Sequence, residues 1–186
     1  FLPDTVRPHI TQVLDAWPQA AAELYHNDNA IFALHPNELT LAHLHITHEA
    51  TTMVDSLDQV PSPISKVLFE IAPQHLDELY RYILAQSWAS LYEVIPSSVC
   101  FLELTAKGAD KGGMVCRLAQ MLHIAPENIY CVGDHANDLG MLAVSAIPFA
   151  PANAIESVRS FPGIRLLPDA RCGAIAELIR QLDQKY

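Results

Sequence analysis

The chain has 186 residues, of which 51% are hydrophobic and 17% charged, and its formal net charge at pH 7 is −10. This composition is typical of folded chains with a sizeable core and excludes an intrinsically disordered chain. The negative charge argues against nucleic acids and anionic membranes as partners. No apolar stretch approaches the ~18 residues of a membrane span, so we expect no membrane partner.

The cysteines and the first residues bear on location and processing. The four cysteines form no close pair and no CxxC motif, and three of them lie in apolar contexts. Buried thiols in a reducing compartment are therefore favoured, and we expect a cytoplasmic protein. The chain begins at Phe1 without Met, which suggests a cut start. Asp4 and Arg7 interrupt this segment too early for a signal peptide.

Residues 1–106 are expected to form a strand-rich α+β unit of two similar halves, each a helix followed by a hairpin. Apolar residues at helical spacing predict a helix from Pro3 to Trp17. Strands are predicted over 30–34 and 39–46, separated by a Pro-Asn turn. After a polar loop over 55–63, the predicted elements are a strand over 66–71, a helix over 73–86 and two strands over 91–95 and 99–104.

Residues 107–186 show a different pattern, in which short apolar strands alternate with helices. Helices are predicted over 111–123, 139–144, 154–160 and 172–182, and strands over 129–132, 147–150 and 164–167. In the first helix, Met114, Leu118, Met121 and Leu122 are expected to face the core, and Asn153 is expected to cap the third. Alternation at this spacing predicts βαβ units and a parallel sheet. Three strands are too few for a complete domain, so we expect half of a Rossmann-like domain.

The segment from Ile129 to Asp138 carries the clearest chemistry. A buried strand leads into Gly133, and Asp134, Asn137 and Asp138 follow. Ligands bind at the carboxyl ends of strands in open parallel sheets. Two carboxylates and an amide oxygen suit Mg²⁺, which prefers oxygen ligands. The alternative is an Asp/Asn-rich turn that caps the next helix, and the residues alone leave both interpretations open.

The motifs of residues 98–186 resemble the C-terminal portion of the haloacid dehalogenase (HAD) superfamily. The resemblance lies in Lys111-Gly112-Gly113, the Gly133–Asp138 segment, Asn153-Ala154 and the closing helix GAIAELI. More narrowly, the chain resembles Cof-type phosphatases with a type II cap, which residues 1–97 match only in layout. The resemblance implies an α/β fold, in which 1–106 form an α+β cap domain and 107–186 the C-terminal half of the Rossmann-like core.

The resemblance also implies a role for each motif residue. Lys111 corresponds to the catalytic lysine that neutralises charge on the phosphoryl group and the nucleophile. Asp134 corresponds to the aspartate that coordinates Mg²⁺, and Asp138 to the acidic residue that binds the metal directly or through water. Asn137 corresponds to a contact to phosphate or to the metal's water shell, and Asn153 to a further phosphate contact. Without the resemblance, Lys111 reads as a solvated lysine on a helix surface.

The implied function is a Mg²⁺-dependent phosphatase that acts on a small phosphorylated metabolite, such as a sugar phosphate, through a phospho-aspartate. The DxDxT motif that carries the family's nucleophile does not occur in this sequence, and neither does the Ser/Thr motif that precedes the cap. We therefore expect the nucleophile to come from a segment upstream and this polypeptide alone to be inactive. The alternatives are a phosphomutase of the same superfamily and a non-catalytic ligand-binding or interaction relative.

His35, His43, His45 and His48 lie close together in the sequence. Alternation along the predicted strand would place His43 and His45 on one face, which raises the question of a transition-metal site. No cysteine or acidic residue has metal-site spacing with them, so surface or cap-lining histidines are favoured, with a phosphosugar contact as the alternative.

Overall fold

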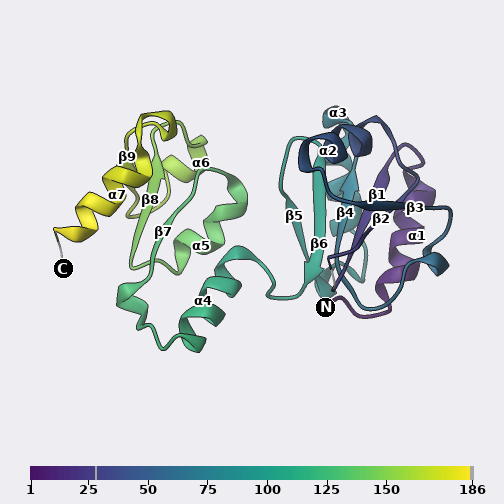
Figure 1. The fold of residues 1–186 in the computed structure, drawn as a ribbon, viewed down its shortest axis with the longest axis horizontal. Helices are drawn as coiled ribbons and strands as arrows, with labels where there is room; N and C mark the ends of the chain where they lie inside the picture. Colours follow the sequence, from purple (N-terminus) through teal and green to yellow (C-terminus); the bar gives the residue numbers. More distant parts are fainter. Residues whose placement is uncertain (28, 185–186) are drawn as a thin grey trace. The chain divides into compact units, whose positions relative to one another are not determined.

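The computed structural model describes residues 1–27 and 29–184, and the chain divides into two compact units, Phe1–Gly108 (unit 1) and Ala109–Tyr186 (unit 2). Each unit has its own sheet and its own apolar core (Figure 1). The predicted α/β fold class is confirmed. None of the helices in the described ranges is long and apolar enough to cross a membrane.

Unit 1 is built on a six-stranded sheet with the order β3-β2-β1-β4-β6-β5. Neighbouring strands are antiparallel except β2 and β3, which are parallel. The strands are β1 (Ala21–His26), β2 (Ile31–Leu34), β3 (Thr51–Val54), β4 (Ile64–Glu70), β5 (Tyr92–Pro96) and β6 (Phe101–Ala106).

The two faces of this sheet are covered by different helices. Helices α1 (Val6–Ala16) and α3 (Pro73–Leu84) pack against one face, where their apolar stripes meet inward side chains such as Leu24 and Phe69. Because successive side chains of a strand alternate between faces, Glu23 and Glu70 point to the opposite face. Helix α2 (Glu38–Thr47) contacts that opposite face.

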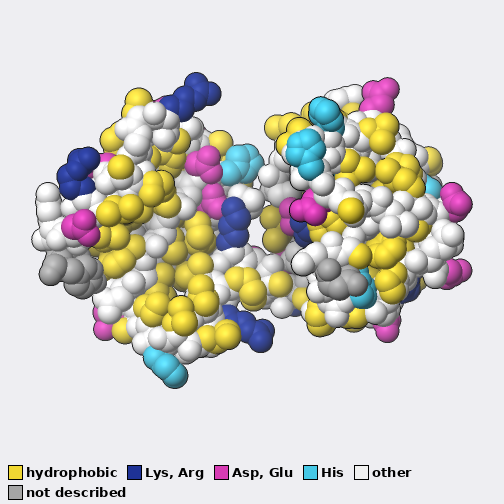
Figure 2. All heavy atoms as spheres, viewed as in Figure 1, with side chains coloured by type: hydrophobic (Ala, Val, Ile, Leu, Met, Phe, Trp, Pro, Cys, Tyr) yellow, Lys and Arg dark blue, Asp and Glu magenta, His cyan; other side chains and the backbone are white. Residues whose placement is uncertain are grey.

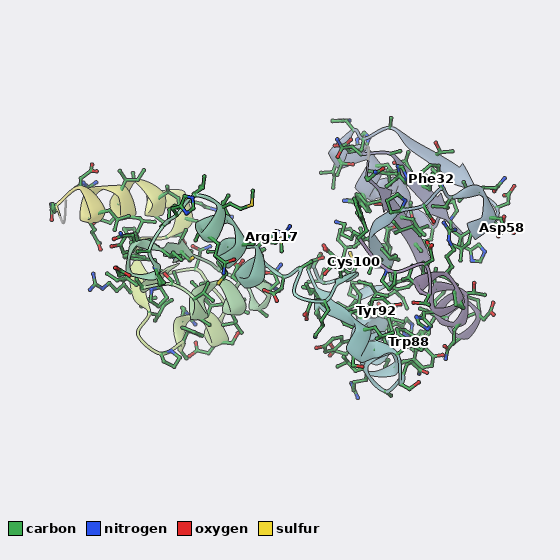
Figure 3. All side chains as sticks on the ribbon, turned by 90° about the horizontal axis from the view of Figure 1, so that it is seen from below. Phe32, Asp58, Trp88, Tyr92, Cys100 and Arg117 are labelled. Atoms are coloured by element: carbon green, nitrogen blue, oxygen red, sulfur yellow. The ribbon has the colours of Figure 1, made fainter. Side chains whose placement is uncertain are left out.

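An aromatic group lies at the edge of the unit 1 core, where Figure 3 labels Trp88 and Tyr92. The His9 ring stacks on the Trp88 ring with centroids 4.5 Å apart, and Trp88 meets Tyr92 edge-on at 5.9 Å. The His9 Nδ1 is 2.8 Å from the Tyr92 hydroxyl. Burial lowers the pKa of His9, because the charged imidazolium loses contact with water.

The predicted strand over 39–46 is wrong, because these residues form α2. Asn37 precedes the helix, and its side chain accepts hydrogen bonds from the backbone N–H of Leu39 and Thr40 in a capping box. The apolar residues of α2 alternate with polar ones, which is the pattern expected of a strand. The Asn37 cap, in contrast, is a signal for the start of a helix. Two strands were missed, β1 and β3.

Unit 2 contains a three-stranded parallel sheet in the order β7-β8-β9, as the alternation of strands and helices predicted. Apolar clusters lie on both faces, one around Leu142 and Val158 and the other around Leu178. The elements are α4 (Lys111–Met121), β7 (Tyr130–Val132), α5 (Leu139–Ala143), β8 (Ile147–Pro151), α6 (Glu156–Arg159), β9 (Arg165–Leu167) and α7 (Ala174–Asp183).

The predicted inward face of α4 is wrong. Met114, Leu118, Met121 and Leu122 are all exposed, and Figure 2 shows hydrophobic side chains on the surface over this helix. The side of α4 that packs within unit 2 carries Gly112, Val115 and Ala119 instead. These residues follow the i, i+3, i+7 spacing of one helix face, but two of them are small and give a weak hydrophobic signal.

Candidate functional site

The candidate site begins at Gly133, the residue that follows β7. The Gly133 N–H donates to the Phe149 carbonyl of the neighbouring strand β8 at 3.1 Å, which continues the sheet by one residue. A Cβ on Gly133 would lie 2.4 Å from the Cβ of Asp138. Glycine is therefore required here for close approach, because Asp138 packs directly on the backbone at position 133.

Asp138 is 4% exposed, and both oxygens of its carboxylate are occupied. Its Oδ2 accepts hydrogen bonds from the backbone N–H of Asp134 at 2.9 Å and of His135 at 3.1 Å. Its Oδ1 accepts a charge-assisted hydrogen bond from Lys111 Nζ at 2.5 Å. Burial raises the pKa of the Asp138 carboxyl, but the Lys111 ammonium and the two backbone N–H groups outweigh it and hold the pKa below its usual range.

Helix α4 carries Lys111 to this carboxylate. Asp110 caps the helix, and its Oδ1 accepts a hydrogen bond from the Gly113 N–H at 2.8 Å. A Cβ on Gly112 would lie 2.4 Å from the Gly140 carbonyl oxygen of α5. The glycine at position 112 thus lets α4 and α5 approach closely, and this approach places Lys111 beside Asp138.

The other three predicted site residues, Asp134, Asn137 and Asn153, have different surroundings. The Asp134 side chain is exposed at the end of β7, and its carbonyl accepts from the Ile155 N–H at 3.0 Å. That bond joins the loops that follow β7 and β8. Asn137 directly precedes Asp138 in a short 3₁₀ turn, Ala136–Asp138.

Asn153 does not cap a helix, which corrects the prediction. Helix α6 begins two residues later than expected, with Ile155 at its N-cap position. The Asn153 Oδ1 instead accepts a hydrogen bond from the Ala170 N–H at 2.9 Å. This bond uses the carbonyl end of the amide, so the NH₂ end is the one that can donate to an anion.

The donor set fits Mg²⁺, although Asp134 and Asp138 contribute differently. The exposed Asp134 carboxylate and the Asn137 amide offer oxygen atoms, which Mg²⁺ prefers. Asp138 already binds Lys111 and two backbone N–H groups, so its oxygens are less free to bind a metal. The turn-capping interpretation left open by the sequence also has support, since Asp138 bonds the N–H of the N-cap residue His135.

A second group of ionisable residues, which sequence reasoning missed, lies in unit 1. The Glu23 and Glu70 side chains are fully buried, and the half-buried His43 contacts both. The His43 Nδ1 is 3.1 Å from Glu23 Oε2 and 3.7 Å from Glu70 Oε1. Burial raises the pKa of Glu70 to about 7, although the Thr40 hydroxyl and His43 act in the opposite direction. The sequence signal is weak, because β5 and β6 carry one glutamate each just as β1 and β4 do.

Comparison with known proteins shows the family of this chain. A family model described as haloacid dehalogenase-like hydrolase matches residues 9–163. The Bacillus subtilis (strain 168) protein named "Putative phosphatase YxeH" is 35% identical over 104 residues, which are 55% of this chain and 38% of YxeH. The chain thus spans well under half the length of that relative.

Solved structures show the same fold over nearly the whole chain. A haloacid dehalogenase-like hydrolase from Bacteroides thetaiotaomicron superposes with a TM-score of 0.78 at 22% identity, covering 97% of this chain and 67% of that one. The structure described as the HAD subclass IIB sugar phosphatase BT4131 superposes with a TM-score of 0.80 at 17% identity, covering 98% and 67%. Because the family model matches more than half of the chain, the protein belongs to the haloacid dehalogenase-like hydrolases.

Proposed function

We propose that unit 2 carries the lysine and cation-binding half of the active site of a Mg²⁺-dependent phosphatase that acts on a small phosphorylated metabolite, such as a sugar phosphate. The observation that carries the proposal is the Lys111–Asp138 pair at the carboxyl end of β7, with the exposed Asp134 carboxylate beside it. In this proposal unit 1 is the cap domain, and the protein acts in the cytoplasm. The sugar phosphatase among the structural neighbours supports the substrate class.

Each residue has a distinct task in the proposed reaction. Lys111 lies at the N-terminal end of α4, where its ammonium and the helix dipole both favour a phosphoryl group. Asp138 keeps the ammonium in place. Asp134, with Asn137, would hold Mg²⁺, which supplies charge neutralisation of the phosphoryl oxygens. The NH₂ group of Asn153 would donate to phosphate. Phosphoryl transfer requires mainly such positioning and charge neutralisation.

The nucleophilic aspartate is proposed to come from a segment outside residues 1–186. Two observations support this: the sequence holds no DxDxT motif, and the chain covers only about two thirds of its structural neighbours. The proposal therefore predicts that residues 1–186 alone do not hydrolyse a phosphate ester.

The test uses p-nitrophenyl phosphate with this chain and with a version extended upstream through the nucleophile motif. We expect no turnover by residues 1–186 and Mg²⁺-dependent, chelator-sensitive turnover by the extended protein. In the extended protein, Lys111→Met should lower kcat by about 10²–10³-fold, the usual effect of losing one transition-state donor. Lys107→Met is the matched control, because Lys107 pairs with Glu93 in unit 1.

Four results would contradict the proposal. Chelator-sensitive turnover by residues 1–186 would place the nucleophile within them. Unchanged kcat in Lys111→Met would remove the lysine from the reaction. An extended protein that binds phosphorylated sugars without turnover would favour a non-catalytic relative, and transfer of the phosphoryl group to a second sugar rather than to water would favour a phosphomutase.

A further inference from the structure

The group formed by Glu23, His43 and Glu70 is brought together by three separate elements of unit 1. Glu23 lies on β1 and Glu70 on the adjacent antiparallel strand β4, where the register pairs Ala21 with Glu70. His43 comes from α2, which lies on the same face of the sheet. One ligand atom from each of the three side chains can be chosen so that these atoms all lie within 4.8 Å of one another.

One oxygen in this group has no hydrogen-bond partner among the described residues. Glu70 Oε1 is buried and accepts no hydrogen bond, whereas Glu70 Oε2 accepts one from the Thr40 hydroxyl. The hydroxyl thereby orients the carboxylate so that Oε1 faces His43. An unpaired buried carboxylate oxygen is costly, because the lost hydration is not replaced.

A proton on Glu70 Oε1 would not be shared with His43. If Glu70 were protonated on Oε1, the O–H of its carboxyl group would need an acceptor. The His43 Nδ1 lies 3.7 Å from Oε1. That distance exceeds the normal range of hydrogen bonds. An ion pair between His43 and Glu23 is compatible with their 3.1 Å contact, but it leaves Oε1 unpaired.

A divalent metal ion would satisfy all three groups at once. Zn²⁺ binds carboxylate oxygens and imidazole nitrogens at about 2.0–2.2 Å in tetrahedral geometry, so its ligand atoms lie about 3.4 Å from one another. The distances of 3.1 Å and 3.7 Å from His43 Nδ1 to the two glutamates bracket that value. Two carboxylates and a neutral imidazole also balance the charge of the ion. We propose that Glu23, His43 and Glu70 form a Zn²⁺-type metal site in unit 1.

Neighbouring side chains hold the three proposed ligands in place. The Tyr25 hydroxyl donates to Glu23 Oε2 at 2.8 Å, and the Thr40 hydroxyl donates to Glu70 Oε2. The Phe101 ring lies against the His43 ring, with centroids 4.9 Å apart. Such contacts fix ligand orientation in metal sites. The bound ion would link α2 to β1 and β4 and would hold this helix on the sheet.

The test measures binding of Zn²⁺ to residues 1–186 by calorimetry, with Mg²⁺ present in excess to occupy the oxygen ligands of unit 2. We expect Glu70→Gln and His43→Gln to weaken Zn²⁺ binding by more than about 100-fold. Tyr25→Phe, which removes only one hydroxyl that bonds to a proposed ligand, should weaken it by about 10- to 100-fold. His45→Gln, a change on the exposed side of the same helix, should have no effect.

Two further readouts keep the proposal independent of the phosphatase proposal. Asp134→Asn should leave the Zn²⁺ affinity unchanged, whatever it does to phosphate-ester hydrolysis. Co²⁺ should give the visible absorption of a four-coordinate site in the parent chain but not in Glu70→Gln. Hydrogen exchange should show stronger protection of α2 when Zn²⁺ is added.

The proposal is overturned if the parent and Glu70→Gln bind Zn²⁺ equally, or if the parent shows no Zn²⁺ binding that depends on these three side chains. In either case the group is an ion pair with a shared proton. Loss of Zn²⁺ binding in Glu70→Gln or His43→Gln could also result from misfolding. Tyr25→Phe controls for this, because it leaves the three ligands and their charges in place.

Discussion

Replacing Gly133 by alanine tests whether Asp138 is fixed against the backbone at the end of β7. The new Cβ would lie 2.4 Å from the Cβ of Asp138 and 2.9 Å from its Cγ. The Asp138 side chain cannot turn away freely, because its carboxylate binds Lys111 and two backbone N–H groups. The conflict must therefore be relieved by a shift of the backbone or by loss of these bonds.

The expected magnitude follows from these contacts. Overpacking a filled site costs about 1–3 kcal/mol, and loss of one hydrogen bond to a charged group adds about 1.5–3 kcal/mol. A Gly→Ala change also lowers the conformational entropy of the unfolded chain, which raises the free energy of unfolding by about 0.4–1 kcal/mol. We expect Gly133→Ala to lower the free energy of unfolding of unit 2 by about 1–3 kcal/mol, and by more if Asp138 releases Lys111.

Gly140→Ala provides the matched control. Its Cβ would lie 3.5 Å from Asp110 Oδ1, an ordinary contact, and residue 140 lies within helix α5. Alanine should therefore stabilise unit 2 by about 0.5–1 kcal/mol. Urea-dependent hydrogen exchange of amides in residues 109–184 measures unit 2 separately from unit 1. Equal stability of Gly133→Ala and Gly140→Ala would refute the close packing of Asp138 on position 133.

Two other predictions concern unit 1. Asn37→Ala should lower its free energy of unfolding by about 1–2 kcal/mol in urea melts, because the capping bonds to the first turn of α2 are lost; no change would mean that the cap is not formed in solution. The pKa of His9 is lowered in the folded chain, so the unfolded chain binds a proton at His9 more readily than the folded chain does. The contribution of the neutral His9 ring to the free energy of unfolding is therefore fully present above the unfolded pKa of 6.5 and is lost as the pH falls below it. The difference in stability between the parent and His9→Gln should therefore shrink from about pH 7.5 to about pH 5, and a constant difference would contradict this assignment.

The alternating elements of unit 2 could be predicted from the sequence because their signals are local. The strand before Gly133 is a short apolar run, and the helices between strands show 3.6-residue periodicity. The inward face of α4 could not be predicted in the same way. Gly112 and Ala119 pack inward because α5 approaches closely, whereas the larger Met114 and Leu118 remain exposed. Side-chain size at a close helix contact thus outweighed hydrophobicity.

The errors in unit 1 have a related cause. Strand β1 contains the polar residues Glu23 and His26, and α2 has apolar residues at alternating positions. Both elements are stabilised by contacts from distant parts of the chain: β1 pairs with β2 and β4, and α2 with the polar residues of the sheet. A window of neighbouring residues does not contain those partners. The helix start at Asn37 was the one local signal that could have corrected the assignment of α2.

Local and distant contacts also explain why the sequence revealed the ionisable group of unit 2 but not that of unit 1. Asp134 and Asp138 lie four residues apart, so their spacing alone suggested a cation. Glu23 and Glu70 are 47 positions apart and meet only through the register of β1 and β4. A search based on spacing around the histidines could not find them. Strand composition could not find them either, because β5 and β6 of the same sheet also carry one glutamate each, and Glu93 and Glu103 pair with lysines instead. What distinguishes Glu23 and Glu70 is their burial, which is costly for a carboxylate without a partner. That burial is set by the tertiary fold and not by the neighbouring residues in the sequence.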